Sequence, residues 1–236
     1  MNLPLEQLLQ AANDRPQDAR VHFELGNGWA SQGRYAEAAE SFRRVVALRP
    51  DVAAAHFNLA NALLSLEQWE EAARALEACV ALGPAPDALE NLALAYVQCD
   101  KVEQAIDSLR HALRLHPESL TACLRLTRLL VARESYDEPQ RLLQAALTRA
   151  PNHPQLRAEW AQLHQAKGDV WAAIEAWGAA IELDPDQSEW RCYRGALLQL
   201  VGQKDEARRV VDEGLARNPD DPRLLAFIDA CLTANG

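Results

Sequence analysis

Residues 21–50 read VHFELGNGWASQGRYAEAAESFRRVVALRP and end on Pro50. Prolines recur at this spacing along the whole chain, at intervals of 34 residues with one interval of 33: Pro16, Pro50, Pro84, Pro117, Pro151, Pro185 and Pro219. A constant period of about 20–50 residues is typical of a solenoid, in which one supersecondary unit stacks on the next. The period therefore predicts a repeat protein, and it favours binding because solenoids present extended surfaces.

Side-chain size recurs with the prolines. The first half of each repeat has a small residue after a large one: Gly26, Ala60, Ala93, Thr127, Ala161 and Gly195. The second half has another small position (Ala38, Ala72, Ala105, Pro139, Ala173, Ala207) and, four places on, a large apolar one (Phe42, Leu76, Leu109, Leu143, Trp177, Val211). Spacings of three and four are helical, so each repeat is predicted to hold two helices. The break falls near Gly33, Gly168 or Gly202 where glycine is present, and the repeat proline ends the second helix.

This pattern resembles the tetratricopeptide repeat over residues 19–219. The resemblance implies an all-α, right-handed superhelical solenoid of helix-turn-helix repeats with a C-terminal capping helix. The expected divisions are a partial N-terminal repeat at 1–16, repeats at 19–52, 53–85, 86–119, 120–153, 154–187 and 188–221, and a capping helix at 222–236. Trp171 is expected among the core positions and Trp190 on a more exposed one. Thr127 and Pro139 make the fourth repeat the least regular, and a bend is expected there.

The composition limits which classes of partner and which cellular compartment are expected for this protein. The net charge of −10 argues against a nucleic-acid partner, which requires a basic surface. The N-terminus MNLPLEQLLQ has no basic region followed by an apolar run, and no stretch reaches transmembrane length. We therefore expect a cytoplasmic protein without membrane insertion. Five cysteines without a C-x-x-C pair predict free thiols in a reducing compartment.

No catalytic motif is found in the sequence. It contains neither a Gly-rich phosphate loop of the G-x-x-x-x-G-K type nor a G-x-S-x-G elbow. His22 and His56 share one repeat position, which packing explains better than a metal. His111 and His116 are five residues apart, a poor spacing for two ligands on one helix face. We expect a non-catalytic protein with no metal and no cofactor.

Candidate binding residues follow from the family's architecture. In that architecture the first helices of successive repeats line a concave groove. The implied groove positions hold four asparagines, which are Asn27, Asn58, Asn61 and Asn91. Asparagine is a mediocre helix former, and its carboxamide matches both the donor and the acceptor of a peptide bond. A row of them could hold an extended peptide without reading its sequence, with Phe23 and Phe57 as apolar anchors.

One run within this region has a closer resemblance. Residues 55–64, AHFNLANALL, are similar to repeats of O-GlcNAc transferase, whose concave asparagines grip peptide backbone. By that resemblance Asn58 and Asn91 match the ladder position. The alternative is that these asparagines are tolerated polar surface residues, as in many members of the family.

Arg125 and Arg128 lie one helical turn apart on the implied groove face and form a candidate anion site. The alternative is that they pair with Glu90 and Glu159 of neighbouring repeats. A further family function is the carboxylate clamp for chaperone tails, to which Asn61, Asn91 and Arg125 correspond. The two lysine positions of that clamp hold Phe57 and Thr121, which argues against it.

Three functional hypotheses remain open. The first is an adaptor that binds a protein or peptide partner in its concave groove. The second is an assembly scaffold that forms homo-oligomers or docks through its convex face and terminal helices. The third is a recruitment module that acts with a separate enzyme such as a glycosyltransferase.

Overall fold

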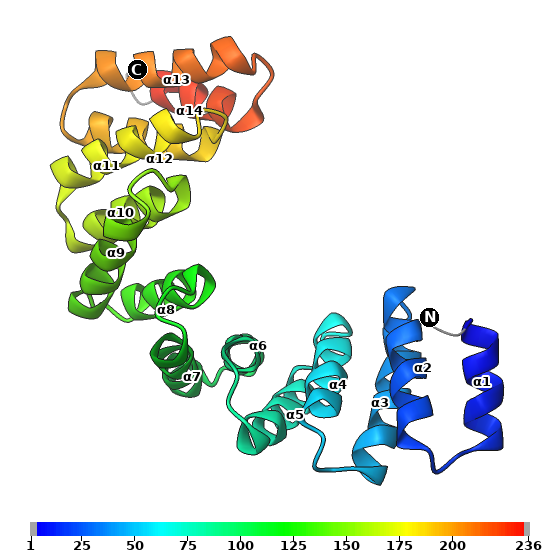
Figure 1. Ribbon diagram of the computed structural model, residues 1–236. Helices are drawn as coiled ribbons and strands as arrows, with labels where there is room; N and C mark the ends of the chain where they lie inside the picture. Colours follow the sequence, from blue (N-terminus) through cyan, green and yellow to red (C-terminus); the bar gives the residue numbers. More distant parts are fainter. Residues whose placement is uncertain (1–3, 234–236) are drawn as a thin grey trace. The chain divides into compact units, whose positions relative to one another are not determined.

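The structure is a computed structural model that describes residues 4–233 (Figure 1). Between these residues it contains fourteen α-helices and no strand. Residues 1–3 and 234–236, at the outer ends of the predicted partial repeat and capping helix, lie outside the described residues. The chain forms two compact units, Met1–Ala122 and Cys123–Gly236. The boundary falls inside α8 (Leu120–Ala132), within the predicted fourth repeat.

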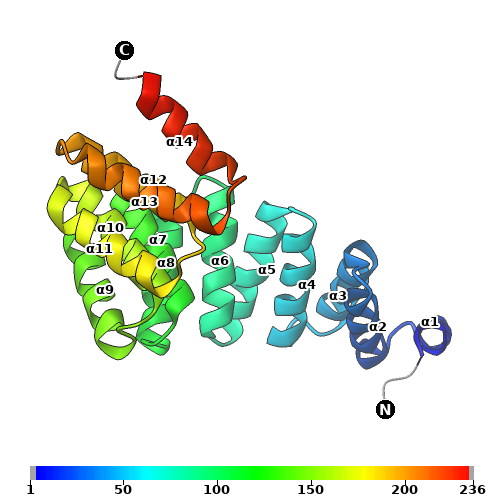
Figure 2. The ribbon, with the colours of Figure 1, turned by 90° about the horizontal axis from the view of Figure 1, so that it is seen from above.

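The first unit is a series of antiparallel helix pairs. Its helices are α1 (Leu5–Asp14), α2 (Ala19–Ser31), α3 (Tyr35–Leu48), α4 (Ala53–Ser65), α5 (Trp69–Leu82), α6 (Pro86–Gln98) and α7 (Val102–Leu115). Each helix packs on the next, so α3 joins α2 to α4 and α5 joins α4 to α6 (Figure 2). Such nearest-neighbour packing is the pattern expected of stacked repeats.

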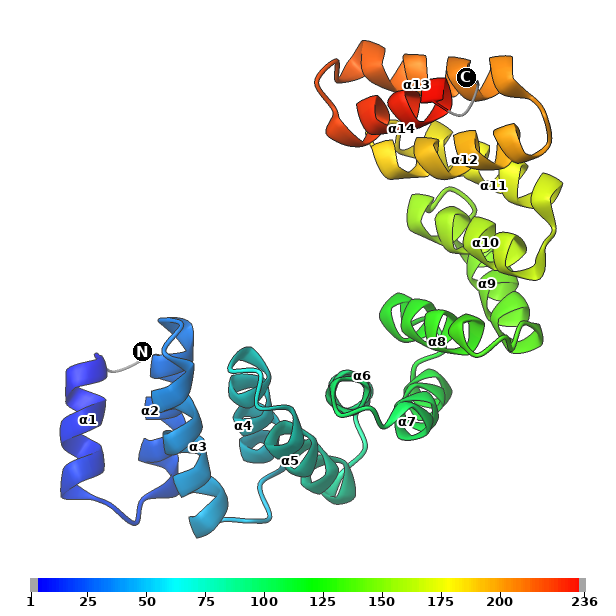
Figure 3. The same ribbon diagram turned by 180° about the vertical axis from the view of Figure 1, so that it is seen from behind.

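The second unit repeats the arrangement. Its helices after α8 are α9 (Asp137–Arg149), α10 (Pro154–Lys167), α11 (Val170–Leu183), α12 (Ser188–Leu200), α13 (Lys204–Arg217) and α14 (Pro222–Thr233). Helices α10 and α11 pair closely, as do α12 and α13, and α14 packs on both α12 and α13 (Figure 3). The fold is therefore the all-helical solenoid that the period predicts.

The core consists of the predicted small and large positions. All six residues at the first small position and all six at the second are buried. The large position is buried as well, with Trp177 at 0% and Phe42 at 1% exposure. Small residues let the two helices of a repeat approach closely, and the large ones fill the space between them. Pro139 is one of these buried residues and lies in the first turn of α9, where its missing amide proton costs little.

The break between the two helices of a repeat has a fixed backbone conformation. Gly33, Gly168 and Gly202 have positive φ angles of 73°, 79° and 80°. In the other three complete repeats Glu67, Asp100 and Glu134 adopt the same left-handed region, each with a φ of 58°. The turn therefore requires left-handed backbone in every repeat, and three repeats adopt it without glycine.

The last helix caps the solenoid. Its N-cap Asp221 accepts hydrogen bonds from the amides of Arg223 and Leu224 at 3.0 and 3.2 Å, and from the Ser188 hydroxyl at 2.6 Å. Asp229 is exposed ten residues after Pro219, at the position where the complete repeats carry a small buried residue. A carboxylate there opposes close packing of another helix, so α14 suits a terminal position.

Two tryptophans differ from the sequence-based expectation. Trp171 is 57% exposed, whereas Trp190 is 7% exposed. Trp190 packs in the core of α11 and α12, with its ring centroid 6.3 Å from that of Trp177. Trp171 is the second residue of α11, and its repeat position is exposed in all six repeats and acidic in four of the others (Glu70, Glu103, Asp137 and Asp205). The prediction for both residues was therefore wrong.

Candidate functional site

The four predicted asparagines lie on the first helices of three successive repeats, α2, α4 and α6. They form two pairs that bridge adjacent repeats. The Nδ2 atom of Asn58 donates to Oδ1 of Asn27 at 3.1 Å. The Nδ2 atom of Asn91 donates to Oδ1 of Asn61 at 2.9 Å. The same chemical contact therefore occurs twice, once between α2 and α4 and once between α4 and α6.

The pairs leave hydrogen-bonding capacity at the surface. A carboxamide has two N–H donors and two acceptor lone pairs, and each of these bonds uses one donor and one lone pair. Asn27 is exposed and the other three asparagines are half-buried, so their remaining polar groups can meet a ligand from solvent. Mutual bonding also restricts the side-chain rotamers, which lowers the entropy that ligand binding would cost.

The two predicted phenylalanine anchors are half-buried. Phe23 packs edge-on against Phe42 of α3, with a centroid separation of 5.7 Å and an interplanar angle of 67°. Its ring therefore belongs in part to the core of the first repeat. Phe57 occupies the equivalent place on α4 and directly precedes Asn58.

Acidic side chains flank the asparagines. Glu24, one turn before Asn27 on α2, accepts a hydrogen bond from Arg20 Nε at 3.1 Å. Glu90, which precedes Asn91, accepts one from the hydroxyl of Ser119, and the same hydroxyl accepts from the Ala122 amide at 3.1 Å. Glu90 is thus tied to the start of the following first helix.

The predicted arginines belong to the second unit. Arg128 forms an ion pair with Glu159 of α10, with Nε 2.6 Å from Oε1. Gln155 Nε2 donates to the same oxygen at 3.3 Å. The Glu159 side chain is only 1% exposed, so these hydrogen bonds offset the cost of burying its carboxylate. Arg125 is half-buried on α8. The pairing with Glu159 that the sequence left as an alternative is the one observed for Arg128.

A small hollow lies beside Asn27. It has a volume of about 240 Å³ and lies between α1 and α2. Its lining combines apolar and polar side chains: Leu5, Leu8, Glu24, Asn27, Gly28, Ser31 and Gln32. It contains one of the predicted site residues and adjoins the asparagine pairs.

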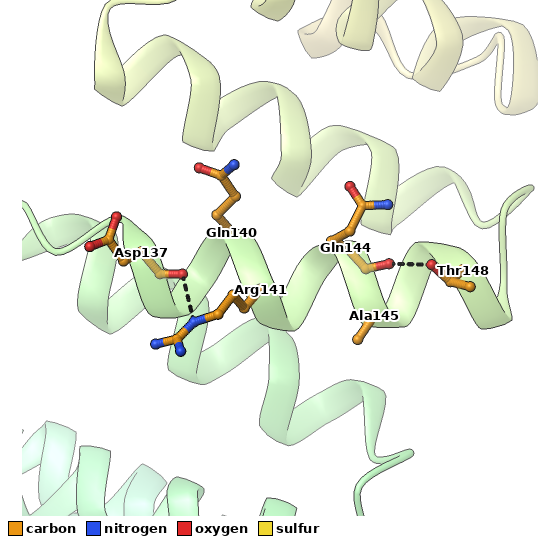
Figure 4. A pocket seen from close by; sticks show the side chains of 6 residues that line it. All are labelled: Asp137, Gln140, Arg141, Gln144, Ala145 and Thr148. Atoms are coloured by element: carbon orange, nitrogen blue, oxygen red, sulfur yellow. Dashed lines mark hydrogen bonds between the residues drawn. The ribbon is translucent and has the colours of Figure 1, made fainter.

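Two other hollows lie in the second unit. A depression of about 690 Å³ is lined by α9 residues (Figure 4): Asp137, Gln140, Arg141, Gln144, Ala145 and Thr148. Arg141 Nε donates to the Asp137 carbonyl oxygen at 3.4 Å, and Lys167 Nζ donates to Gln140 Oε1 at 3.0 Å. A hollow of about 330 Å³ at the start of α12 includes Arg191 and Arg217. Sequence reasoning identified neither of these hollows.

Among residues 4–233 no three His, Cys, Asp or Glu side chains come together as a metal site. In the same range no helix combines the length and apolar composition needed to cross a bilayer. Cys79, Cys99 and Cys123 are free thiols, and burial raises the pKa values of Cys79 and Cys123.

Comparison with known proteins identifies the repeats. Models of the tetratricopeptide repeat match residues 5–53, 30–84, 57–119 and 158–222, and a second model of this repeat matches 100–163. The chain is 26% identical over 132 residues to interferon-induced protein with tetratricopeptide repeats 2 from Homo sapiens, a match that includes 51% of this chain. The chain covers only 28% and 32% of the lengths of the curated relatives it matches.

Solved structures share the fold at low identity. The C-terminal part of a TPR repeat-containing protein from Cytophaga hutchinsonii superposes with a TM-score of 0.79 at 13% identity, covering 94% of this chain and 92% of that one. YrrB, described as a TPR protein with an unusual peptide-binding site, gives 0.54 at 16% identity, covering 96% and 100%. Matches to the repeat models along most of its length show that this chain belongs to the tetratricopeptide repeat family.

Proposed function

We propose that the protein is a non-catalytic interaction module that binds an extended peptide segment along α2, α4 and α6. The observation that carries this proposal is the pair of asparagine bridges, Asn27 to Asn58 and Asn61 to Asn91. Each bridge places two carboxamides at a junction between repeats. An extended peptide that crosses these junctions would meet the same set of donors and acceptors at each one.

Hydrogen-bond chemistry supports a peptide backbone as the ligand. A peptide unit offers one N–H and one C=O, which a carboxamide can match with its own C=O and N–H. Neutral amides make no demand on the charge of the ligand's side chains, so recognition through them tolerates many sequences. The proposed resemblance of residues 55–64 to O-GlcNAc transferase repeats and the peptide-binding site named for YrrB favour the same ligand class.

The proposed site is confined to the first unit. Phe23 and Phe57 would contribute apolar contact beside the asparagines. Arg128 is engaged by Glu159, so we assign it a structural role and leave it out of the peptide site. The exposed Asp229 on α14 gives no support to an assembly scaffold built by stacking on that helix.

A peptide selected by the wild-type protein from a random library tests the proposal. Its dissociation constant would be measured by fluorescence anisotropy for wild type and for Asn58→Ala/Asn91→Ala. Loss of two side-chain hydrogen bonds to the ligand predicts at least about tenfold weaker binding. The control Gln104→Ala/Gln144→Ala removes two exposed carboxamides elsewhere and should bind as wild type does.

Backbone recognition has its own test. Replacing the central peptide bonds of the selected ligand with N-methylated ones removes main-chain donors without changing the side chains. We expect this ligand to bind wild type weakly and to show little further loss with the double asparagine variant. Equal binding of both ligands to wild type would show that the backbone is not what the asparagines recognise.

A further inference from the structure

The hollow between α1 and α2 has a size that fits one side chain. Pockets for whole small-molecule ligands typically measure about 300–1,000 Å³. The volume of about 240 Å³ lies below that range. Because Asn27 belongs to both the hollow and the first asparagine bridge, a peptide held by the bridge would pass its opening.

One side of the hollow is apolar and closely packed. Leu8 is 4% exposed and Leu5 is half-buried, and both side chains come from α1. Gly28 of α2 faces them, and a Cβ atom added there would lie 3.0 Å from Leu5 Cδ1 and 3.7 Å from Leu8 Cδ1. The absence of a side chain at Gly28 therefore lets the leucines form the apolar wall.

The other side is polar and carries a negative charge. Glu24 contributes a carboxylate, Asn27 and Gln32 contribute carboxamides, and Ser31 contributes a hydroxyl. The Ser31 hydroxyl donates its proton to the Gly28 carbonyl oxygen at 2.8 Å, so the lone pairs of Ser31 remain as acceptors. An apolar wall opposite an acidic rim suits a side chain with an aliphatic stem and a cationic end.

We infer that this hollow receives a lysine or arginine side chain of the bound peptide, with its stem against Leu5 and Leu8 and its charge on Glu24. This inference rests on the proposed function and adds a specificity determinant to it. The asparagines would hold the peptide backbone, and the hollow would fix which residue of the peptide lies at the α1 end.

Glu24 is available to such a ligand. Its present partner, Arg20, is 87% exposed, and the Glu24 side chain is 41% exposed. An exposed ion pair of neighbouring turns contributes little stability, so a ligand cation can exchange with Arg20. The chain's net charge of −10 also attracts basic segments and raises their association rate.

The test uses a random peptide library in which no position is fixed as a charged residue. Binding peptides are selected in parallel, at low salt, against the wild-type protein and the variants Glu24→Gln, Glu24→Lys and Glu182→Gln. Glu182 is exposed on α11 of the second unit, so Glu182→Gln changes the net charge equally at a distant place. We expect lysine or arginine to be enriched at one ligand position by wild type and by Glu182→Gln. Glu24→Gln should lose the enrichment, and Glu24→Lys should replace it with acidic residues.

Affinity gives a second readout. A selected peptide with its lysine changed to norleucine keeps the stem and loses the charge. The norleucine peptide should bind the wild-type protein about fivefold more weakly than the parent peptide, as expected for the loss of a partly exposed ion pair. The two peptides should bind Glu24→Gln with equal affinity.

The outcomes separate this inference from the proposed function. Peptides that lose binding with Asn58→Ala/Asn91→Ala, yet show no basic enrichment, would overturn the inference and leave the peptide site in place. Basic enrichment that persists in Glu24→Gln would also overturn it. A wild-type protein that selects no peptides would overturn both.

Discussion

The imidazole Nε2 of His56 lies 2.9 Å from the carbonyl oxygen of Pro50. A carbonyl oxygen only accepts, so the ring nitrogen donates this bond. The contact joins the first helix of a repeat to the proline that ended the helix before it. Three other repeats place a donor six residues after their proline: His22 on Pro16 at 3.1 Å, Arg157 on Pro151 at 3.1 Å and Arg191 on Pro185 at 3.2 Å.

His56→Leu should destabilise the protein. The substitution removes one hydrogen bond to a main-chain carbonyl, and we expect a loss of about 1 kcal/mol in the free energy of unfolding. His56→Arg should recover most of that loss, because arginine makes the same contact in two other repeats. Urea unfolding followed by circular dichroism would measure the changes. Equal stability of the leucine and arginine variants would contradict the role of the bond.

The hydrogen-bond donor six residues after the repeat proline illustrates which features could be predicted from the sequence and which could not. The 34-residue period and the sizes of the core residues predicted the helices, because packing requires similar volumes in every repeat. The period placed His22 and His56 at one repeat position, but histidine and arginine differ in size and shape, so an alignment by residue size does not connect these histidines with Arg157 and Arg191. Comparison of hydrogen-bond donors at fixed distance from each proline would have found them.

The candidate site was likewise predictable in its residue positions but not in the contacts between them. The repeat register identified the four asparagine positions. Their pairing depends on the rotation and spacing of successive first helices, which the period does not determine. The exposure of Trp171 could have been predicted from the acidic residues at the same position in other repeats. The hollow beside Asn27 could not, because its walls depend on how α1 packs against α2.

Gly26 is predicted to be intolerant of a side chain. A Cβ atom there would lie 2.7 Å from Cε1 of Phe42, closer than carbon atoms can pack. Phe42 is 1% exposed and has little room to move, so Gly26→Ala should lower the free energy of unfolding by about 1–3 kcal/mol. Thermal unfolding monitored by circular dichroism would detect the change.

A compensating substitution tests the cause. Repeats two and three combine alanine at the small position with leucine at the large one: Ala60 with Leu76 and Ala93 with Leu109. Gly26→Ala/Phe42→Leu should therefore be more stable than the sum of the two single changes predicts. Additive effects would show that the Gly26 to Phe42 contact is not the source of the destabilisation.

Arg128 is expected to support stability. Arg128→Ala would leave the Glu159 carboxylate, which is 1% exposed, with only its bond to Gln155. Removing one partner of a buried pair costs more than the pair contributes, and the half-exposed position of Arg128 moderates the effect. We expect a loss of about 1–3 kcal/mol, measured by urea unfolding.

The double variant Arg128→Ala/Glu159→Gln separates a structural from a ligand-binding role. It removes the buried charge together with its partner and should recover part of the lost stability. If Arg128→Ala left stability unchanged and weakened peptide binding instead, the anion-site interpretation of this residue would be restored.

Tyr96 should make stability depend on pH in the alkaline range. Burial, together with the hydrogen bond that its hydroxyl donates to Glu77 at 2.7 Å, raises the pKa of Tyr96 to about 12. The unfolded chain has a tyrosine pKa of about 10. Between these values the folded state holds the proton that the unfolded state has lost, so the free energy of unfolding falls as pH rises from about 10 through about 12. The contribution lost is on the order of 1–3 kcal/mol.

Tyr96→Phe has no proton to lose, and the difference in stability between wild type and this variant should shrink over that range in urea unfolding. A difference that stays constant from pH 9 to pH 12 would show that the phenol of Tyr96 titrates as it does in the unfolded chain.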